Sequence, residues 1–149
     1  MDCKLKAVIL FLSLVGLIAC AGHEDIIELR SGDLLFQEAT TGHLSEAIDK
    51  VTQTSDETHF SHVGLVEVTD SGIYVLHASP VGGACEIPIA KFLHPEGDSV
   101  LTVAYRLKDQ WQKSIPVALQ SAKQMLGKPY NFSYILSDTA YYCSEFVYL

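Results

Sequence analysis

Basic side chains are scarce in this chain of 149 residues. Lys and Arg together number 10 against 18 Asp and Glu, which gives a formal net charge of −8 at pH 7. A protein that binds nucleic acid or anionic lipid through its folded surface needs a basic patch that neutralises phosphates. This acidic balance therefore excludes nucleic acid as an expected partner. Charged residues are 19% of the chain and apolar residues 48%, a composition that also excludes a disordered protein.

The sequence also lacks an apolar run long enough to span a membrane. Its longest run, Ala7–Ala19, would cover ~20 Å as a helix, whereas the hydrocarbon core of a bilayer is ~30 Å thick. Lys4 and Lys6 precede this run, and the whole segment therefore predicts a secretory signal peptide. It ends in Leu17-Ile18-Ala19-Cys20, which resembles the lipobox of bacterial lipoproteins. That resemblance implies cleavage before Cys20 and acylation of this cysteine.

These features predict a division into three parts: a lipoprotein signal peptide at residues 1–19, a tether at residues 20–30, and one folded domain at residues 31–149. Lipid on Cys20 would anchor the protein to a membrane of the bacterial cell envelope, on its periplasmic or outer face. Ordinary cleavage after Ala21 is the alternative. The chain stops one or two turns into an apparent helix, so we expect it to be truncated at the C-terminus. We expect a monomer.

The sequence has four cysteines, and two of them are predicted to lie outside the folded domain. Cys3 leaves with the signal peptide and Cys20 receives lipid, so that Cys85 and Cys143 remain in the domain. A disulfide between them is one alternative in an oxidising compartment. Cys85 follows Val81-Gly82-Gly83-Ala84, which we predict to be a loop, whereas Cys143 enters a helical stretch. These different settings favour two free thiols.

The apolar periodicity predicts an α+β domain. An alternating or continuous apolar pattern indicates strands, and apolar residues at i, i+3, i+4 and i+7 indicate helices. The predicted strands are Gly32–Gln37, Phe60–Val68, Gly72–Ser79 and Ser99–Leu107, and the predicted helices are His43–Val51, Ile115–Leu126 and Tyr142–Tyr148.

Two of the six histidines, His62 and His77, lie inside apolar strands. If Thr69 pairs with Gly72 around a two-residue turn, His62 becomes the diagonal neighbour of His77 on one face of the hairpin. A slip of one residue would send the two rings to opposite faces. In the register set by the Thr69–Gly72 pair, Gly64 faces His77 and leaves space beside both rings for a substrate or a third side chain. Either histidine alone is equally typical of a half-buried strand.

Cys143 supplies a nucleophile for this pair. A helix N-terminus lowers the pKa of a cysteine, because backbone N–H groups and the positive end of the dipole favour the thiolate. With His62 as base and His77 as the group that orients it, the three residues form a nucleophile–base–orienter relay. The backbone N–H of Cys143 is the expected oxyanion donor, with Gln37 and Tyr142 as candidate side-chain helpers.

The same Cys/His/His set matches the ligands of zinc. These residues lack the close paired spacing of typical zinc sites, and we therefore expect no metal and no cofactor.

Four motifs occur in an order that resembles the YiiX-like permuted papain-fold family: Gly32–Phe36, Phe60–Gly64, Val75–Ala78 and Tyr142–Val147. This family is the circularly permuted branch of the NlpC-type cysteine peptidases and amidases, related to lecithin retinol acyltransferase. The resemblance implies an α+β, circularly permuted papain-like fold, a small antiparallel sheet or barrel packed with helices. It also implies Cys143 as nucleophile and His62 as general base. His77 stands where YiiX-like members commonly have glutamate, and in this it is similar to the acyltransferases.

We therefore expect an envelope-anchored cysteine hydrolase that cleaves amide or ester bonds through an acyl-enzyme. Its expected substrate is a peptide or acyl amide derived from the cell wall. An acyltransferase or lipid-acyl hydrolase of the same fold is one alternative, and a non-catalytic ligand-binding lipoprotein is another.

Overall fold

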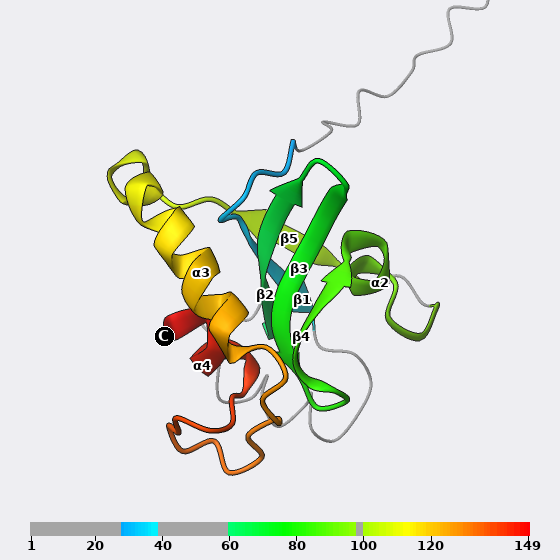
Figure 1. Ribbon diagram of the computed structural model, residues 1–149. Coiled ribbons are helices and arrows are strands. Elements are labelled where there is room, and N and C mark those ends of the chain that lie inside the picture. Colours follow the sequence, from blue (N-terminus) through cyan, green and yellow to red (C-terminus); the bar gives the residue numbers. More distant parts are fainter. Residues whose placement is uncertain (1–27, 39–59, 98–99) are drawn as a thin grey trace, which may run out of the picture.

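The computed structural model describes residues 28–38, 60–97 and 100–149 (Figure 1). The predicted signal peptide with Cys20, most of the predicted tether, and the predicted helix His43–Val51 lie outside these residues. No helix in the described ranges is long and apolar enough to cross a membrane.

Within the described residues, five antiparallel strands form one open sheet in the order β4-β3-β2-β1-β5, and the structure is therefore a sheet and not a closed barrel. The central strand β2 is the longest of the five and carries His62. The strands are β1 (Leu34–Glu38), β2 (Phe60–Thr69), β3 (Gly72–Ser79), β4 (Gly83–Pro88) and β5 (Thr102–Tyr105).

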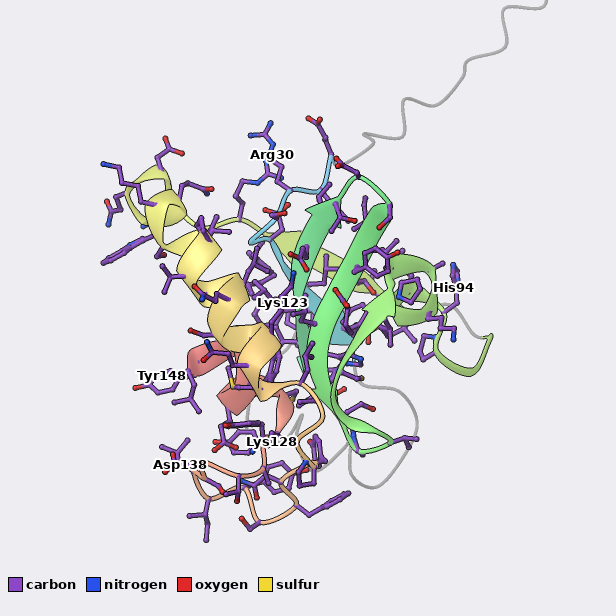
Figure 2. The ribbon with its side chains drawn as sticks, viewed as in Figure 1. Arg30, His94, Lys123, Lys128, Asp138 and Tyr148 are labelled. Carbon is purple, nitrogen blue, oxygen red and sulfur yellow. The ribbon has the colours of Figure 1, made fainter. Side chains whose placement is uncertain are left out.

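Helices cover both faces of the sheet, so the α+β prediction is confirmed (Figure 1). α3 (Ile115–Met125) and α4 (Cys143–Tyr148) lie on one face, and α2 (Ile89–Leu93) lies on the other. Figure 2 shows the same division, with His94 on the α2 side and Lys123 and Tyr148 on the other. Short 3₁₀ helices at Pro95–Gly97 and Asp109–Ser114 complete the described elements.

Strand alternation builds a separate hydrophobic core on each face. Leu65 of β2 and Leu76 of β3 point toward α3 and α4, where they pack with Phe146. Val66 and Val75, one residue along each strand, point the other way and pack with Phe92 of α2. The sheet is therefore buried on both faces, and a polar side chain on either face must find a partner.

The predicted hairpin register is confirmed, because β2 and β3 pair from Thr69–Gly72 to Leu65–Leu76. Two other predictions need correction. The strand predicted at Ser99–Leu107 is only Thr102–Tyr105. The loop predicted before Cys85 is a three-residue turn, Pro80–Gly82, and β4 begins at Gly83; Gly82 and Gly83 both have positive φ. Cys85 is therefore a strand residue that pairs with His77, because the two glycines close a second hairpin instead of extending a loop.

The Gly32-Asp33 motif has a structural role at the start of β1. The buried Asp33 carboxylate accepts two hydrogen bonds from Arg106, at 2.8 and 2.7 Å, and one from the backbone N–H of Arg30. Burial raises the pKa of Asp33, but the hydrogen bonds from Arg106 and Arg30 outweigh it and hold the pKa below its usual value. Gly32 has φ +91°, and a Cβ there would overlap the Ile115 side chain.

Candidate active site

His62 and His77 form a hydrogen-bonded pair on the α2 face of the sheet. His62 Nε2 lies 2.8 Å from His77 Nδ1, and the two ring centroids are 5.0 Å apart at an interplanar angle of 74°. The predicted register places the rings on one face, and the structure confirms that placement. One proton lies between the rings, so one histidine donates and the other accepts.

Phe92 is the third side chain beside this pair. Its ring centroid lies 5.6 Å from that of His62 and 5.4 Å from that of His77, and only 1% of the residue is exposed. A Cβ on Gly64 would stand 3.0 Å from the Phe92 ring and would overlap Val75. The space left by Gly64 is thus filled by an aromatic ring from α2 and is not open to a substrate.

Burial keeps both imidazoles neutral at neutral pH. It lowers the pKa of His62 to about 3, with a further contribution from His77, and lowers the pKa of His77 to about 4. A neutral imidazole has one N–H and one basic nitrogen. Since His77 occupies Nε2 of His62, Nδ1 is the nitrogen through which His62 exchanges a proton with any other group.

β2 and β3 separate next to the histidines. The ladder between them ends at Leu65–Leu76, although β2 continues to pair with β1 as far as Phe60 and β3 continues to pair with β4 as far as Ser79. The backbone of β2 from Phe60 to Gly64 has therefore lost one of its two neighbouring strands. This stretch is where the thiol of Cys143 makes contact.

Cys143 is the first residue of α4 and is 6% exposed. Its Sγ lies 3.8 Å from the carbonyl oxygen of Ser61, the residue before His62. Because α4 and α2 cover opposite faces of the sheet, the thiol and the imidazoles reach one segment of β2 from opposite sides (Figure 1). Among the described residues, the thiol donates its hydrogen bond to this carbonyl and not to either imidazole.

The predicted low pKa of Cys143 is wrong for this conformation. Burial raises the pKa of the thiol, and hydrogen bonds from the backbone N–H groups of Ser144, Val63 and Cys143 offset only part of that effect. The helix that follows has six residues, and its N–H groups do not compensate for the loss of water around the sulfur. Cys143 is therefore a protonated thiol at neutral pH.

A buried glutamate fixes the start of α4, and the sequence analysis missed it. Glu145, 1% exposed, accepts hydrogen bonds from the backbone N–H of Ser137 at 2.6 Å and of Tyr142 at 3.2 Å. It also accepts one from Nδ2 of the buried Asn131, at 3.2 Å. The available signal was its position: a glutamate three residues after the N-cap is half of a capping box.

Tyr130 is a second residue that was missed. Burial raises the pKa of its hydroxyl, and a hydrogen bond with Tyr134 at 3.4 Å and the neighbouring Cys143 add to that effect. The ring of Tyr142, a predicted oxyanion helper, packs against Tyr134 with centroids 5.3 Å apart. The tyrosines that precede Cys143 therefore pack against one another next to the thiol.

Gln37, the other predicted helper, lies on the α2 face and holds α2 in place. Its Nε2 donates to the carbonyl oxygen of Phe92 at 2.6 Å and to Oγ1 of Thr102 at 3.4 Å. Both amide hydrogens therefore have acceptors. Through Phe92, Gln37 supports the ring that packs on the two histidines.

Cys85 completes the polar groups on this face. Its Sγ lies 3.4 Å from Nε2 of His77, and both Cys85 and Cys143 are free thiols. His62, His77 and Cys85 line a cavity of about 720 Å³ that is bordered by Ser79, Lys91 and His94. The sequence analysis placed Cys85 in a loop and so missed this contact.

The described segments hold no group of three or more His, Cys, Asp or Glu arranged to bind a metal ion. The nitrogens that His62 and His77 turn toward each other are already joined by a hydrogen bond. These donors do not fit a metal site in this arrangement.

Comparison with known proteins gives consistent matches. Residues 28–149 match the family described as "Permuted papain-like amidase enzyme, YaeF/YiiX, C92 family". The uncharacterized protein YiiX of Escherichia coli K12 is 32% identical over 124 residues, which are 80% of this chain and 55% of YiiX. A crystal structure described as metalloprotein yiiX from Escherichia coli O157:H7 is similar with a TM-score of 0.57 at 30% identity, over 79% of this chain and 62% of that one. The chain thus spans little more than half the length of these relatives.

Proposed function

The chain belongs to the family of permuted papain-like amidases, and on this basis we propose that it is a cysteine hydrolase that cleaves amide bonds through an acyl-enzyme on Cys143. One observation carries the proposal. The buried thiol of Cys143 contacts the carbonyl of Ser61, the residue before His62 on β2, and His62 has a second ring nitrogen besides the one that faces His77. A thiol, a neutral imidazole and an orienting partner are the groups that nucleophilic catalysis needs.

The proposed reaction begins from neutral groups. The sulfur of Cys143 attacks the carbonyl carbon of the substrate while its proton passes to Nδ1 of His62, and the π electrons of the carbonyl move to oxygen. The tetrahedral intermediate then expels the amine, which takes the proton from His62. Water attacks the resulting thioester with His62 again as base, and the acid product and the free thiol are released.

Electrostatic support comes from groups that already face the sulfur. The N–H groups of Val63, Cys143 and Ser144 favour negative charge at this position, both on a developing thiolate and on an oxyanion next to it. In the proposed reaction His77, whose Nδ1 lies 2.8 Å from His62 Nε2, accepts the Nε2–H of His62 and orients its ring. As a neutral imidazole, His77 orients the base but supplies no negative charge to the imidazolium, unlike the glutamate of the YiiX-like proteins.

For the substrate, we propose peptide or acyl amides of the bacterial cell wall. The lipobox-like segment ending at Cys20 supports a location in the envelope, where such amides occur. Acyl transfer by the same residues is the second candidate. It is favoured because position 77 holds a histidine, as in the acyltransferases, and not a carboxylate. The crystallised relative is described as a metalloprotein; the residues described in this chain do not fit a metal site, so no proposed step uses one.

Two measurements on the chain without residues 1–19 test the proposal. The first is turnover of a panel of muropeptides and fluorogenic acyl amides, which Cys143→Ala should abolish. The second is the alkylation rate of Cys143 by iodoacetamide, followed by peptide mapping. His62→Gln should lower this rate on the order of 100-fold, because the thiol then lacks its base.

His94→Gln is the matched control, since it removes an exposed histidine from the rim of the same cavity and leaves both members of the pair in the chain. It should leave the alkylation rate of Cys143 unchanged. Equal rates in wild type and His62→Gln, together with no turnover of any panel member, would overturn the proposed function.

A further inference from the structure

The histidine pair ends at a third residue. Cys85 on β4 is the direct cross-strand partner of His77 on β3, and its Sγ lies 3.4 Å from His77 Nε2. Nδ1 of His77 is bonded to His62 Nε2 at 2.8 Å. Both nitrogens of His77 therefore have partners, and the three side chains form a linear series His62–His77–Cys85.

The direction of the protons in this series decides what His62 can do. A neutral His77 has one N–H. If that N–H is on Nε2, it donates to Cys85, and Nδ1 accepts the proton-bearing Nε2 of His62. His62 then has a lone pair on Nδ1 and can act as a base.

The opposite direction makes the base inactive. If the N–H of His77 is on Nδ1, it donates to His62 Nε2, and the single proton of a neutral His62 must lie on Nδ1. That nitrogen cannot accept the proton of Cys143. The ability of His62 to act as a base therefore depends on Cys85, the third side chain of the series.

We propose that Cys85 is a positioning residue whose sulfur accepts the Nε2–H of His77 and thereby holds His62 in its base-competent tautomer. The inference rests on the proposed function of Cys143 and extends it. During the reaction the proton of Cys143 passes to Nδ1 of His62, while the hydrogen bonds from His62 to His77 and from His77 to Cys85 keep their direction. No bond forms or breaks at Cys85.

The surroundings of Cys85 fit this role. Burial raises the pKa of Cys85, which is therefore a neutral thiol at neutral pH, and its sulfur lone pairs are free to accept. The other titratable groups that line the cavity are Glu38, Lys91 and His94. Among the residues with described side chains, the hydrogen bonds of His77 are to His62 and Cys85.

Ring-nitrogen NMR of the chain without residues 1–19, labelled with ¹⁵N-histidine, tests the direction of the series. Long-range ¹H–¹⁵N correlation separates protonated from bare ring nitrogens, and the wild type should show His77 protonated at Nε2. Cys85→Ala should give a mixture of His77 tautomers and lower the Cys143 alkylation rate about 3- to 10-fold, the effect of one lost hydrogen bond. Cys85→Ser keeps an acceptor and should restore both properties, and Ser79→Ala, in the same cavity, should change neither.

A wild-type His77 protonated at Nδ1 would overturn the inference, and this result needs no variant to fold. An unchanged tautomer and alkylation rate in Cys85→Ala would do the same. Failure of the proposed function gives a different result: the alkylation rate of Cys143 then does not respond to His62→Gln, whatever the tautomer of His77.

Discussion

The histidine pair, in which His77 is buried and His62 half-buried, should make the folded domain sensitive to mild acid. The pKa of His62 is about 3 and that of His77 about 4 in the fold, against 6.5 for an ordinary histidine. As the pH falls below 6.5, the unfolded chain binds a proton on each of these residues and the folded chain does not. Stability is therefore fully present above pH 6.5 and is lost progressively as the pH falls toward 4.

The size of the loss follows from the number of protons. Well below pH 6.5, the shifted pKa of each histidine lowers the free energy of unfolding by about 1.4 kcal/mol for each unit by which the pH falls. Between pH 7 and pH 5 this amounts to about 2 kcal/mol for each histidine and about 4 kcal/mol for the pair. A domain of this size has only about 5–15 kcal/mol in total, so the effect is large. Asp33, whose pKa lies below 3.8, loses its contribution at lower pH and outside this interval.

Urea unfolding of the chain without residues 1–19 at pH 7, 6 and 5 measures the loss directly. His77→Gln removes one of the two shifted groups and should roughly halve the dependence on pH, with an unchanged m-value. His94→Gln removes an exposed histidine and should leave the dependence as in the wild type. A wild-type stability that is flat from pH 7 to 5, or an equal slope in His77→Gln, would refute a buried neutral pair.

Two further predictions concern the anchor and the start of α4. Cys20→Ala should release the protein from the membrane fraction and change its electrophoretic mobility, because the acylated residue is lost; a variant that stays membrane-bound with unchanged mobility would contradict the lipoprotein prediction. Glu145→Gln replaces an acceptor of three N–H donors by a group that itself donates, and should cost about 1–3 kcal/mol in urea unfolding and slow Cys143 alkylation. Glu86→Gln, at an exposed position on β4, is its control, and equal stabilities of the two variants would contradict the role given to Glu145.

The histidine pair was predictable because its geometry is local. A two-residue turn at Asp70 and Ser71 fixes the register of the hairpin, and the period of two along each strand then fixes the faces. The eight residues before that turn and the six after it are enough to bring His62 and His77 together. The family resemblance supplied the rest of the fold, since short motifs in the right order identify a topology that periodicity alone does not.

Residues whose role depends on distant contacts were not predictable in this way. Phe92 lies on a helix of five residues, too short for any periodic signal, and its position is known only once α2 packs over Gly64. Cys85 was misplaced because consecutive glycines are equally typical of a loop and of a tight hairpin turn. The pKa of Cys143 depends on a balance between backbone N–H groups and burial, and sequence reveals only the first of these.

The end of the β2–β3 ladder leaves the backbone of β2 beside His62 without β3 as a neighbour, and this is the backbone that the thiol contacts. In a continuous sheet, a helix on one face is separated from side chains on the other by the strand itself, because alternate residues point apart. Here β3 no longer pairs with β2 at Ser61 and His62. The thiol of Cys143 contacts this stretch of backbone from the α4 side. The hydrogen bond between His62 and His77 still joins the two strands on the α2 side. The proposed function requires this separation of the strands, because the thiol and the pair of imidazoles reach β2 from opposite faces and the proton must pass between them where β3 no longer pairs with β2.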